Sequence, residues 1–447
     1  MTVGSPVRQI VKFMIPMLIG NVFQQLYNTV DSIVVGKYIG DNALAAVGSA
    51  GPIVNLLLVL FIGISVGAGI MVSQYFGARQ RLSLSKSIGC SITMTFVSSL
   101  IVMALAPLIS MPLLKLLNTP DEIINWCDDY LRILFLGIAG CAFYNILGGI
   151  LRGLGDSVSA LLYLIIATFL NIILDIFFVA YVGMGVPGVA LATVIAQAIS
   201  AFLSFLKLRR MTDSFDMKAA YLKPDRKYLR ELLRLGLPSG VTQAIFSLSI
   251  VIVQSLTNSF GAMCIATNVI VMRIDGFVMM PAFSFGSAMT TFAGQNIGAG
   301  RLDRVENGAK KGTLVAMATS AVITLLILLF GRYLMALFTD TDALIEQSYH
   351  MMMILGAGYI AMEVTQCLQG VMRGAGDTMA PMWLSMITTV VIRVPLAYLM
   401  TGMTKSAENP HGEFYMMFVS LLITWLIGAT LTTIVYKAGR WKRKALI

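Results

Sequence analysis

The stretch LRGLGD at residues 151–156 returns as MRGAGD at residues 372–377. A second pair, QYFGA at 74–78 and QNIGA at 295–299, has the same spacing, since both pairs of motifs begin 221 residues apart. Two different motifs at one offset rarely arise by chance, and self-similarity at a fixed period is the signature of a repeat. We therefore infer that the chain is a tandem repeat of two long units.

The composition indicates a membrane protein. Hydrophobic residues make up 57% of the 447 residues and charged residues 12%, against roughly 45–50% and about 25% in ordinary globular chains. The net charge of +10 would suggest nucleic acid in a soluble protein. Here the basic residues lie in short segments between apolar runs, so we expect a lipid bilayer and no nucleic acid as partner.

Twelve apolar runs are long enough to cross a bilayer, which takes about 20 helical residues. Lys and Arg gather in alternate connections, whereas the other connections carry only Lys37, Lys115, Arg332 and Lys405. By the positive-inside rule this bias predicts that both termini lie in the cytoplasm. We expect the membrane to be a bacterial inner membrane. The predicted spans are 10–36, 45–75, 87–111, 122–150, 157–181, 186–207, 235–259, 262–293, 312–338, 343–371, 379–402 and 413–436.

Each copy of the repeat then holds six spans. An even number gives both copies the same orientation, which predicts a parallel pseudo-twofold repeat. The polar and basic segment 208–232 is the natural boundary. We predict an all-α integral membrane protein with a lobe at 1–207, a cytoplasmic linker at 208–232 and a lobe with a basic tail at 233–447.

The repeated R-G-x-G-D motif is interpreted as a turn between the fourth and fifth spans of each copy. Its glycines permit a tight turn, and Asp156 and Asp377 are placed to cap the next helix. We expect Arg152 and Arg373 to pair with those carboxylates.

Buried acids are the strongest functional signal, because a charge at mid-membrane costs about 2.5–3.5 kcal/mol. In the first copy, Asp31 shares one helix face with three other polar residues, and Asp175 lies one turn after Asn171. Two carboxylates with amide and hydroxyl oxygens suit Na⁺, and close carboxylates also suit a shared proton. The face of the first span consists of Gln24, Tyr27, Asn28 and Asp31.

The second copy carries different chemistry. Arg273 and Asp275 are two residues apart and face different partners, Glu363 is a further acid, and Arg393 is placed to neutralise one of them. Methionines such as Met279 suit either core packing or an adaptable binding surface. Asp128 and Asp129 are expected to reach water near the outer end of the fourth span.

Other chemistry has little support in the sequence. The five cysteines are scattered without a C-x-x-C pair and are interpreted as core residues, and two histidines cannot build a His-based metal site. No nucleotide-binding loop or catalytic motif is present. We expect no enzyme activity, no cofactor, and no metal beyond a Na⁺ ion at Asp31, Asn171 and Asp175.

The motifs together resemble the multidrug and toxic compound extrusion (MATE) family, and are most similar to its bacterial damage-inducible-protein-like branch. They are QxxYNxxD at 24–31, NxxxD at 171–175, GVPGVALAT at 185–193, the two R-G-x-G-D turns and QNIGA. The resemblance covers almost the whole chain. It implies a monomeric antiporter whose two lobes rock to export cationic or amphipathic compounds in exchange for Na⁺ or H⁺.

The resemblance also implies site residues. The first-lobe cation site of the family maps onto Asp31, Asn171, Asp175, Thr193 and Tyr27. A substrate cavity would involve Gln24, Asn28, Met279, Arg273, Asp275 and Glu363. The sequence departs from the family at the seventh span, 235–259, which holds no Asp or Glu, so a second-lobe ion site lacks one expected acid.

Two other transporter classes share parts of this pattern. A major-facilitator transporter also has twelve spans and a parallel repeat, but the loop GARQRLSLSK at 77–86 lacks the acid of that family's motif. A flippase for lipid-linked precursors or polysaccharides is the other alternative, although such proteins usually carry two extra spans.

Overall fold

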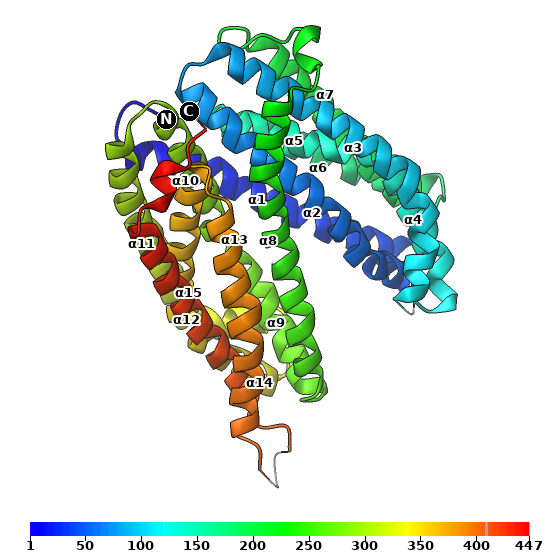
Figure 1. Ribbon diagram of the computed structural model, residues 1–447. Helices are drawn as coiled ribbons and strands as arrows, with labels where there is room; N and C mark the ends of the chain where they lie inside the picture. The colour runs from blue at the N-terminus through cyan, green and yellow to red at the C-terminus, as the bar shows by residue number, and fades with distance from the viewer. Residues whose placement is uncertain (118, 407–409, 447) are drawn as a thin grey trace. The chain divides into compact units, whose positions relative to one another are not determined.

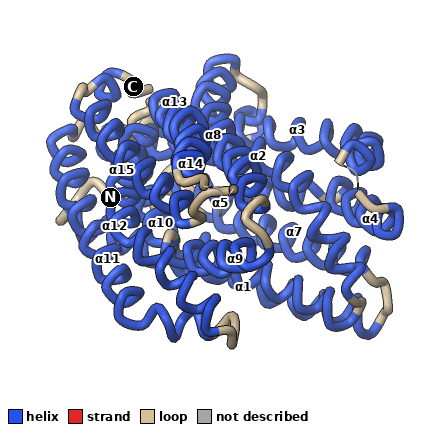
Figure 2. Tube along the Cα trace, turned by 90° about the horizontal axis from the view of Figure 1, so that it is seen from below, coloured by secondary structure: helices blue, strands red, loops and turns tan. Residues whose placement is uncertain are grey.

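The computed structural model describes residues 1–117, 119–406 and 410–446. Within these residues the chain forms helices joined by short loops, and no strand occurs there (Figure 2). The helices of the first copy are α1 (Pro6–Tyr38), α2 (Asp41–Gly77), α3 (Arg81–Leu116), α4 (Asp121–Leu136), α5 (Ile138–Gly153), α6 (Ser157–Asp175), the π-helix η1 (Ile176–Tyr181) and α7 (Val186–Arg210) (Figure 1).

The second copy follows the short 3-10 helix η2 (Ala219–Leu222). Its elements are α8 (Arg226–Asn258), α9 (Ala262–Val278), α10 (Met280–Gly298), α11 (Leu302–Ala336), α12 (Asp342–Gly374), α13 (Met379–Met386), the π-helix η3 (Ile387–Ile392), α14 (Arg393–Met403), α15 (Tyr415–Lys437) and the 3-10 helix η4 (Arg440–Arg443).

These elements supply the predicted membrane spans. Among the described residues, ten helices are long and apolar enough to cross a bilayer, and α4 with α5 makes an eleventh span bent by 53°. The twelfth is α1, which is 33 residues long and carries the polar face predicted from the sequence. The all-α, twelve-span fold is therefore confirmed.

The repeat offset also holds for the helix bounds. Shifting α2 by 221 residues gives 262–298, which is the stretch covered by α9 and α10, and shifting α4 and α5 gives 342–374, which is α12. The copies differ in where they break. The first copy bends between α4 and α5 at Gly137, whereas the second breaks between α9 and α10, just before Pro281 at the start of α10.

The chain forms two compact units. We call residues Pro16–Gly240 the N-terminal unit, and Met1–Ile15 with Val241–Leu446 the C-terminal unit. The linker and the first turns of α8 thus belong with the first copy, and the first turns of α1 with the second. The boundaries at 207 and 233 that the sequence suggests for the functional lobes stay a prediction.

Glycines let two helices of the N-terminal unit approach backbone to backbone. A Cβ atom on Gly63 or Gly67 of α2 would lie 2.7 or 2.8 Å from backbone atoms of Gly236 in α8. No side chain fits at these distances, and close approach through small residues is a usual way of packing helices in membranes.

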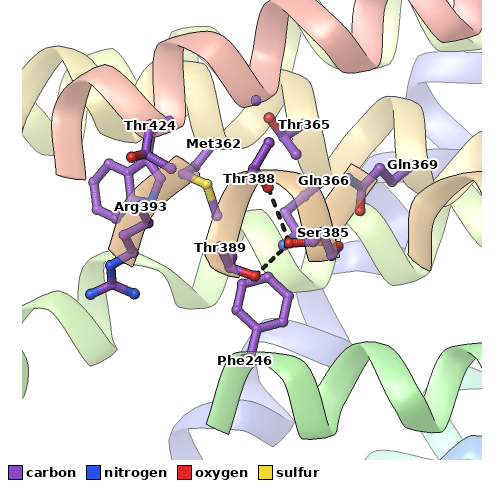
Figure 3. A pocket seen from close by; sticks show the side chains of 12 residues that line it. Phe246, Met362, Thr365, Gln366, Gln369, Ser385, Thr388, Thr389, Arg393 and Thr424 are labelled. Carbon is purple, nitrogen blue, oxygen red and sulfur yellow. Dashed lines mark hydrogen bonds between the residues drawn. The ribbon is translucent and has the colours of Figure 1, made fainter. Parts of the chain in front are cut away.

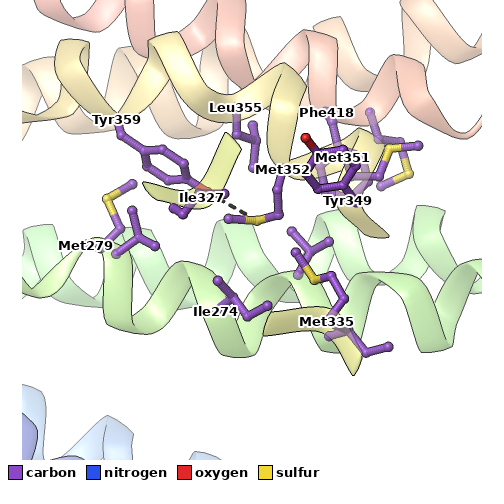
Figure 4. Packing of buried hydrophobic residues seen from close by; sticks show 14 of the residues in the cluster. Ile274, Met279, Ile327, Met335, Tyr349, Met351, Met352, Leu355, Tyr359 and Phe418 are labelled. Atoms are coloured by element: carbon purple, nitrogen blue, oxygen red, sulfur yellow. Dashed lines mark hydrogen bonds between the residues drawn. The ribbon is translucent and has the colours of Figure 1, made fainter. Parts of the chain in front are cut away.

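The core of the C-terminal unit is rich in methionine (Figure 4). Met279, Met351 and Met352 are buried with Tyr359 and Phe418, and the Tyr359 hydroxyl donates to the Met352 sulfur at 3.4 Å. The packing interpretation therefore holds for Met351 and Met352, whereas Met279 both packs in this core and lines a cavity.

Two local expectations were wrong. Asp128 does not reach water, because it is buried, accepts a 2.5 Å hydrogen bond from Ser110 and pairs with Arg132 at 2.7 Å. Asp156 does cap α6 by accepting from Ser159 N, but its ion pair is with Lys207 and not with Arg152.

Candidate functional site

Helices α1 and α6 bring the acids of the N-terminal unit together. Asp31 and Asp175 lie within hydrogen-bond range of each other. With its amide nitrogen facing them, Asn171 donates to Asp31 Oδ1 at 2.7 Å and to Asp175 Oδ2 at 3.2 Å. Asn171 and Asp175 are fully buried, while Asp31 keeps partial exposure. Two carboxyl groups thus share one amide in a water-poor place.

Further oxygens surround this acid pair. Among the described residues, Asp175 Oδ1 and the buried hydroxyls of Tyr27 and Thr193 have no hydrogen-bond partner. Tyr130 of α4 lies close enough for its hydroxyl to feel both carboxylate charges. The sequence did not single out Tyr130, because nothing local marks which residue of α4 faces two other helices.

The backbone is irregular at the same place. The π-helix η1 begins directly after Asp175. The second copy also contains a π-helix, η3, which ends directly before Arg393, but it does not lie at the repeat offset, since shifting η1 by 221 residues gives 397–402 within α14. Single π-turns inside helices are frequent at functional sites. Composition and hydrophobic periodicity do not distinguish a π-helix from an α-helix, so the sequence analysis did not predict η1.

The donor set fits both a sodium ion and a proton. With the amide of Asn171 turned the other way, its oxygen faces the two carboxylates, and an all-oxygen set of this kind suits a hard cation. With the nitrogen facing them, two close carboxylates are suited to share a proton. No cluster of three or more His, Cys, Asp or Glu that could hold a metal occurs within the described residues, so a cation here would depend on neutral oxygens as well.

A polar cavity of about 190 Å³ lies in the same unit. Gln24 lines it, whereas Asn28, one turn further along α1, is exposed and outside its lining. Its walls come from α1, α5, α6 and α7 and include Tyr144, Asn145, Arg152, Ser157 and Ser204.

The C-terminal unit holds a larger cavity of about 260 Å³. Asp275, Met279 and Arg393 all line it, together with Gln254 and Trp425. Arg393 is the charged residue that acts on Asp275. An adjoining cavity of about 40 Å³ shares Arg393, and Figure 3 shows its hydroxyl-rich wall of Ser385, Thr388 and Thr389.

The remaining predicted residues lie apart from these cavities. Arg273 is exposed on α9 and does not line the cavity that holds Asp275. Glu363 is 2% exposed in α12, its Oε2 atom has no hydrogen-bond partner among the described residues, and it lines neither cavity of this unit. Its role in a substrate cavity stays a prediction.

Two six-span copies with ionisable groups buried inside each are typical of a polytopic membrane transporter built from a parallel repeat. The family model MatE matches residues 16–177 and 238–399, one stretch in each copy. The chain therefore belongs to the MATE family, as its motifs predicted.

Relatives and solved structures agree with this. The probable multidrug resistance protein YoeA of Bacillus subtilis is 31% identical over 88% of this chain and 86% of its own length. The probable multidrug resistance protein NorM of Thermotoga maritima is 24% identical over 98% and 94%. A crystal structure of MATE in complex with MaL6 superposes with a TM-score of 0.91 at 23% identity, over 98% of both chains, and shows the fold alone.

Proposed function

We propose that this protein is a secondary active multidrug exporter that moves cationic or amphipathic organic compounds in exchange for Na⁺ or H⁺. The family membership supports export, and the relatives' names, multidrug resistance proteins, support drugs as substrates. That these compounds are cationic or amphipathic is what the resemblance to the family implies. Ion coupling is proposed because the Asn171 amide contacts the carboxylates of both Asp31 and Asp175 inside the N-terminal unit.

The acid pair gives a physical reason for coupling. Two carboxylates in a low-dielectric place repel each other, and a cation or a proton between them removes that cost. Asp31 is the partly exposed member of the pair and would receive the ion, while Asn171 holds Asp175 in place. Neutralising the carboxylates of Asp31 and Asp175 removes their repulsion, so that α1 and α6 can pack more closely. This change in packing would favour one lobe arrangement over the other.

The cavity of the C-terminal unit supports a substrate role. Asp275 offers a negative charge, and Met272, Met279, Phe283 and Trp425 offer adaptable and aromatic surface, the combination that binds organic cations. We propose that it contacts substrate while ion coupling belongs to the N-terminal unit. We also propose the bacterial inner membrane, cytoplasmic termini and a monomer.

Transport in proteoliposomes tests this function. The purified chain is reconstituted, a Na⁺ gradient or a pH gradient is imposed, and movement of the organic cation ethidium is followed by fluorescence. Gradient-driven movement with either ion is the expected result, and the ion that drives it is the coupling ion. Translocation of a lipid-linked sugar precursor with no ethidium movement would overturn the proposal in favour of a flippase.

A further inference from the structure

An arginine without a partner faces the polar cavity of the N-terminal unit. Arg152 lies near the end of α5 and lines the cavity of about 190 Å³. Within the described part of the chain its guanidinium makes no hydrogen bond or ion pair, and the nearby carboxylate of Asp156 is engaged with Lys207 and Ser159. An arginine stays charged in proteins, so this guanidinium is a fixed positive charge at the wall of the cavity.

Only the first copy leaves room beside its arginine, because Gly148 has no side chain to fill the space next to the Arg152 guanidinium. A Cβ atom on Gly148, one turn before, would lie 3.3 Å from Arg152 Nη1, so the absence of a side chain there makes room for the guanidinium. Shifted by the repeat offset, Gly148 corresponds to Gln369 and Arg152 to Arg373. The second copy thus fills with a glutamine side chain the position that the first copy leaves open.

The rest of the lining favours a negative ligand. It contains no Asp or Glu, and its polar members offer hydroxyl and amide groups. Ser157 and Ser204 are 4% and 2% exposed. The other lining residues from α5 are Tyr144, Asn145 and Gly148, and the charge of Arg152 acts on the Tyr144 hydroxyl.

Size limits the ligand. Water occupies about 30 Å³ per molecule in the liquid, so the cavity holds about six waters or one small anionic group. A guanidinium fork matches the oxygens of carboxylate and phosphate, which it binds with two parallel hydrogen bonds. An unpaired charge in a low-dielectric place is costly, and an oxyanion would offset that cost better than neutral groups.

We propose that this cavity is an oxyanion site, in which Arg152 binds the carboxylate of a small organic acid or the phosphate of a lipid headgroup. The site lies in the unit that holds the acid pair. Gln24 at the cavity and Asp31 in the pair are seven residues apart on α1, about 10 Å along a helix. The site is independent of the proposed export function.

Matched small probes test the proposal. Binding of benzoate, its neutral isostere benzamide, and methyl phosphate is measured by saturation-transfer NMR on the full chain in nanodiscs of uncharged phosphatidylcholine. We expect benzoate or methyl phosphate to bind and benzamide not to bind. Arg152→Gln should weaken anion binding about tenfold or more, while Arg373→Gln, the matched arginine of the second turn, should leave it unchanged.

Two further arms keep the test decisive. Gly148→Gln introduces the residue of the second copy and should block the anion even if Arg152→Gln fails to fold. Nanodiscs with phosphatidylglycerol identify the source, since loss of benzoate binding there assigns the site to lipid phosphate and unchanged binding assigns it to soluble acids. Equal binding of benzoate and benzamide, or benzoate binding that survives both Arg152→Gln and Gly148→Gln, would overturn the proposal.

Discussion

The carboxyl groups of Asp31 in α1 and Asp175 at the end of α6 meet at the amide of Asn171, with distances of 2.7 and 3.2 Å to its nitrogen. One amide therefore positions two acids that are far apart in the sequence. The buried member of the pair, Asp175, sits where the α-helix gives way to a π-helix.

Removing the shared amide should impair coupling. In Asn171→Leu the carboxyl groups of Asp31 and Asp175 lose the amide that positions them next to each other. A cation site between them would also lose one neutral oxygen ligand. We expect the concentration of coupling ion that gives half-maximal transport to rise about tenfold or more. Asn145→Leu, an asparagine of α5 in the same unit whose amide donates to Cys141 O, is the control. An unchanged ion dependence in Asn171→Leu would rule out this role.

A methyl group at the α2–α8 contact should destabilise the N-terminal unit. Gly67→Ala places a Cβ atom 2.8 Å from Gly236 N and 2.9 Å from Leu232 O, both backbone atoms. Overpacking of this kind costs about 1–3 kcal/mol, so the melting temperature in detergent should fall. Gly48→Ala in the same helix meets nothing within 4 Å and should melt like the wild type or higher. A fall of the same size in both variants would contradict the packing account.

The helix caps in the two R-G-x-G-D turns should contribute differently to the stability of the protein. Asp156 accepts from Ser159 N at 2.9 Å, whereas Asp377 accepts from Ala380 N at 3.3 Å. Loss of a helix cap costs about 1 kcal/mol, so Asp156→Ala should lower the melting temperature more than Asp377→Ala. The reverse order in thermal melts would show that the hydrogen-bond geometry does not set the stability of these turns.

The linker should be held to α3 by one arginine. Arg81 forms a bidentate pair with Asp216 and donates to the Thr212 and Asp213 carbonyl oxygens. We expect Asp216→Asn to speed tryptic cleavage after Lys218, which is followed by Ala219. Asp213→Asn keeps the backbone acceptor and should cleave like the wild type, and faster cleavage in Asp213→Asn alone would contradict the assignment.

The same contact should be insensitive to pH in the range where transport is measured. Hydrogen bonding to Arg81 holds the pKa of the Asp216 carboxyl below its usual range. Because the folded pKa is lowered, the stabilisation is fully present above the ordinary value of about 3.9 and is lost only as the pH falls through the folded value. Tryptic cleavage of the wild-type linker, normalised to a peptide substrate, should therefore be flat between about pH 6 and 8. A steep pH dependence would contradict the pairing.

Much of the fold was predictable from sequence because lipid imposes simple rules. Twelve apolar runs and one repeat offset gave helix bounds that the structure keeps, as in the match of α2 to α9 and α10. Helix periodicity also placed Gln24, Tyr27 and Asp31 on related faces. Periodicity describes one helix at a time, so it could not predict that α1 and α6 touch, that Tyr130 joins them, or that Ser110 of α3 bonds to Asp128 of α4. Those contacts join different helices and depend on packing.

The central claim is that Asp31 and Asp175 couple the ion gradient to export, and comparison of two transport modes in proteoliposomes tests it most directly. Asp31→Asn and Asp175→Asn should lose gradient-driven accumulation of an organic cation yet keep gradient-free exchange of labelled for unlabelled substrate. Asp129→Asn, an exposed acid of α4, should keep both. Undiminished gradient-driven accumulation in both Asp31→Asn and Asp175→Asn would contradict the account.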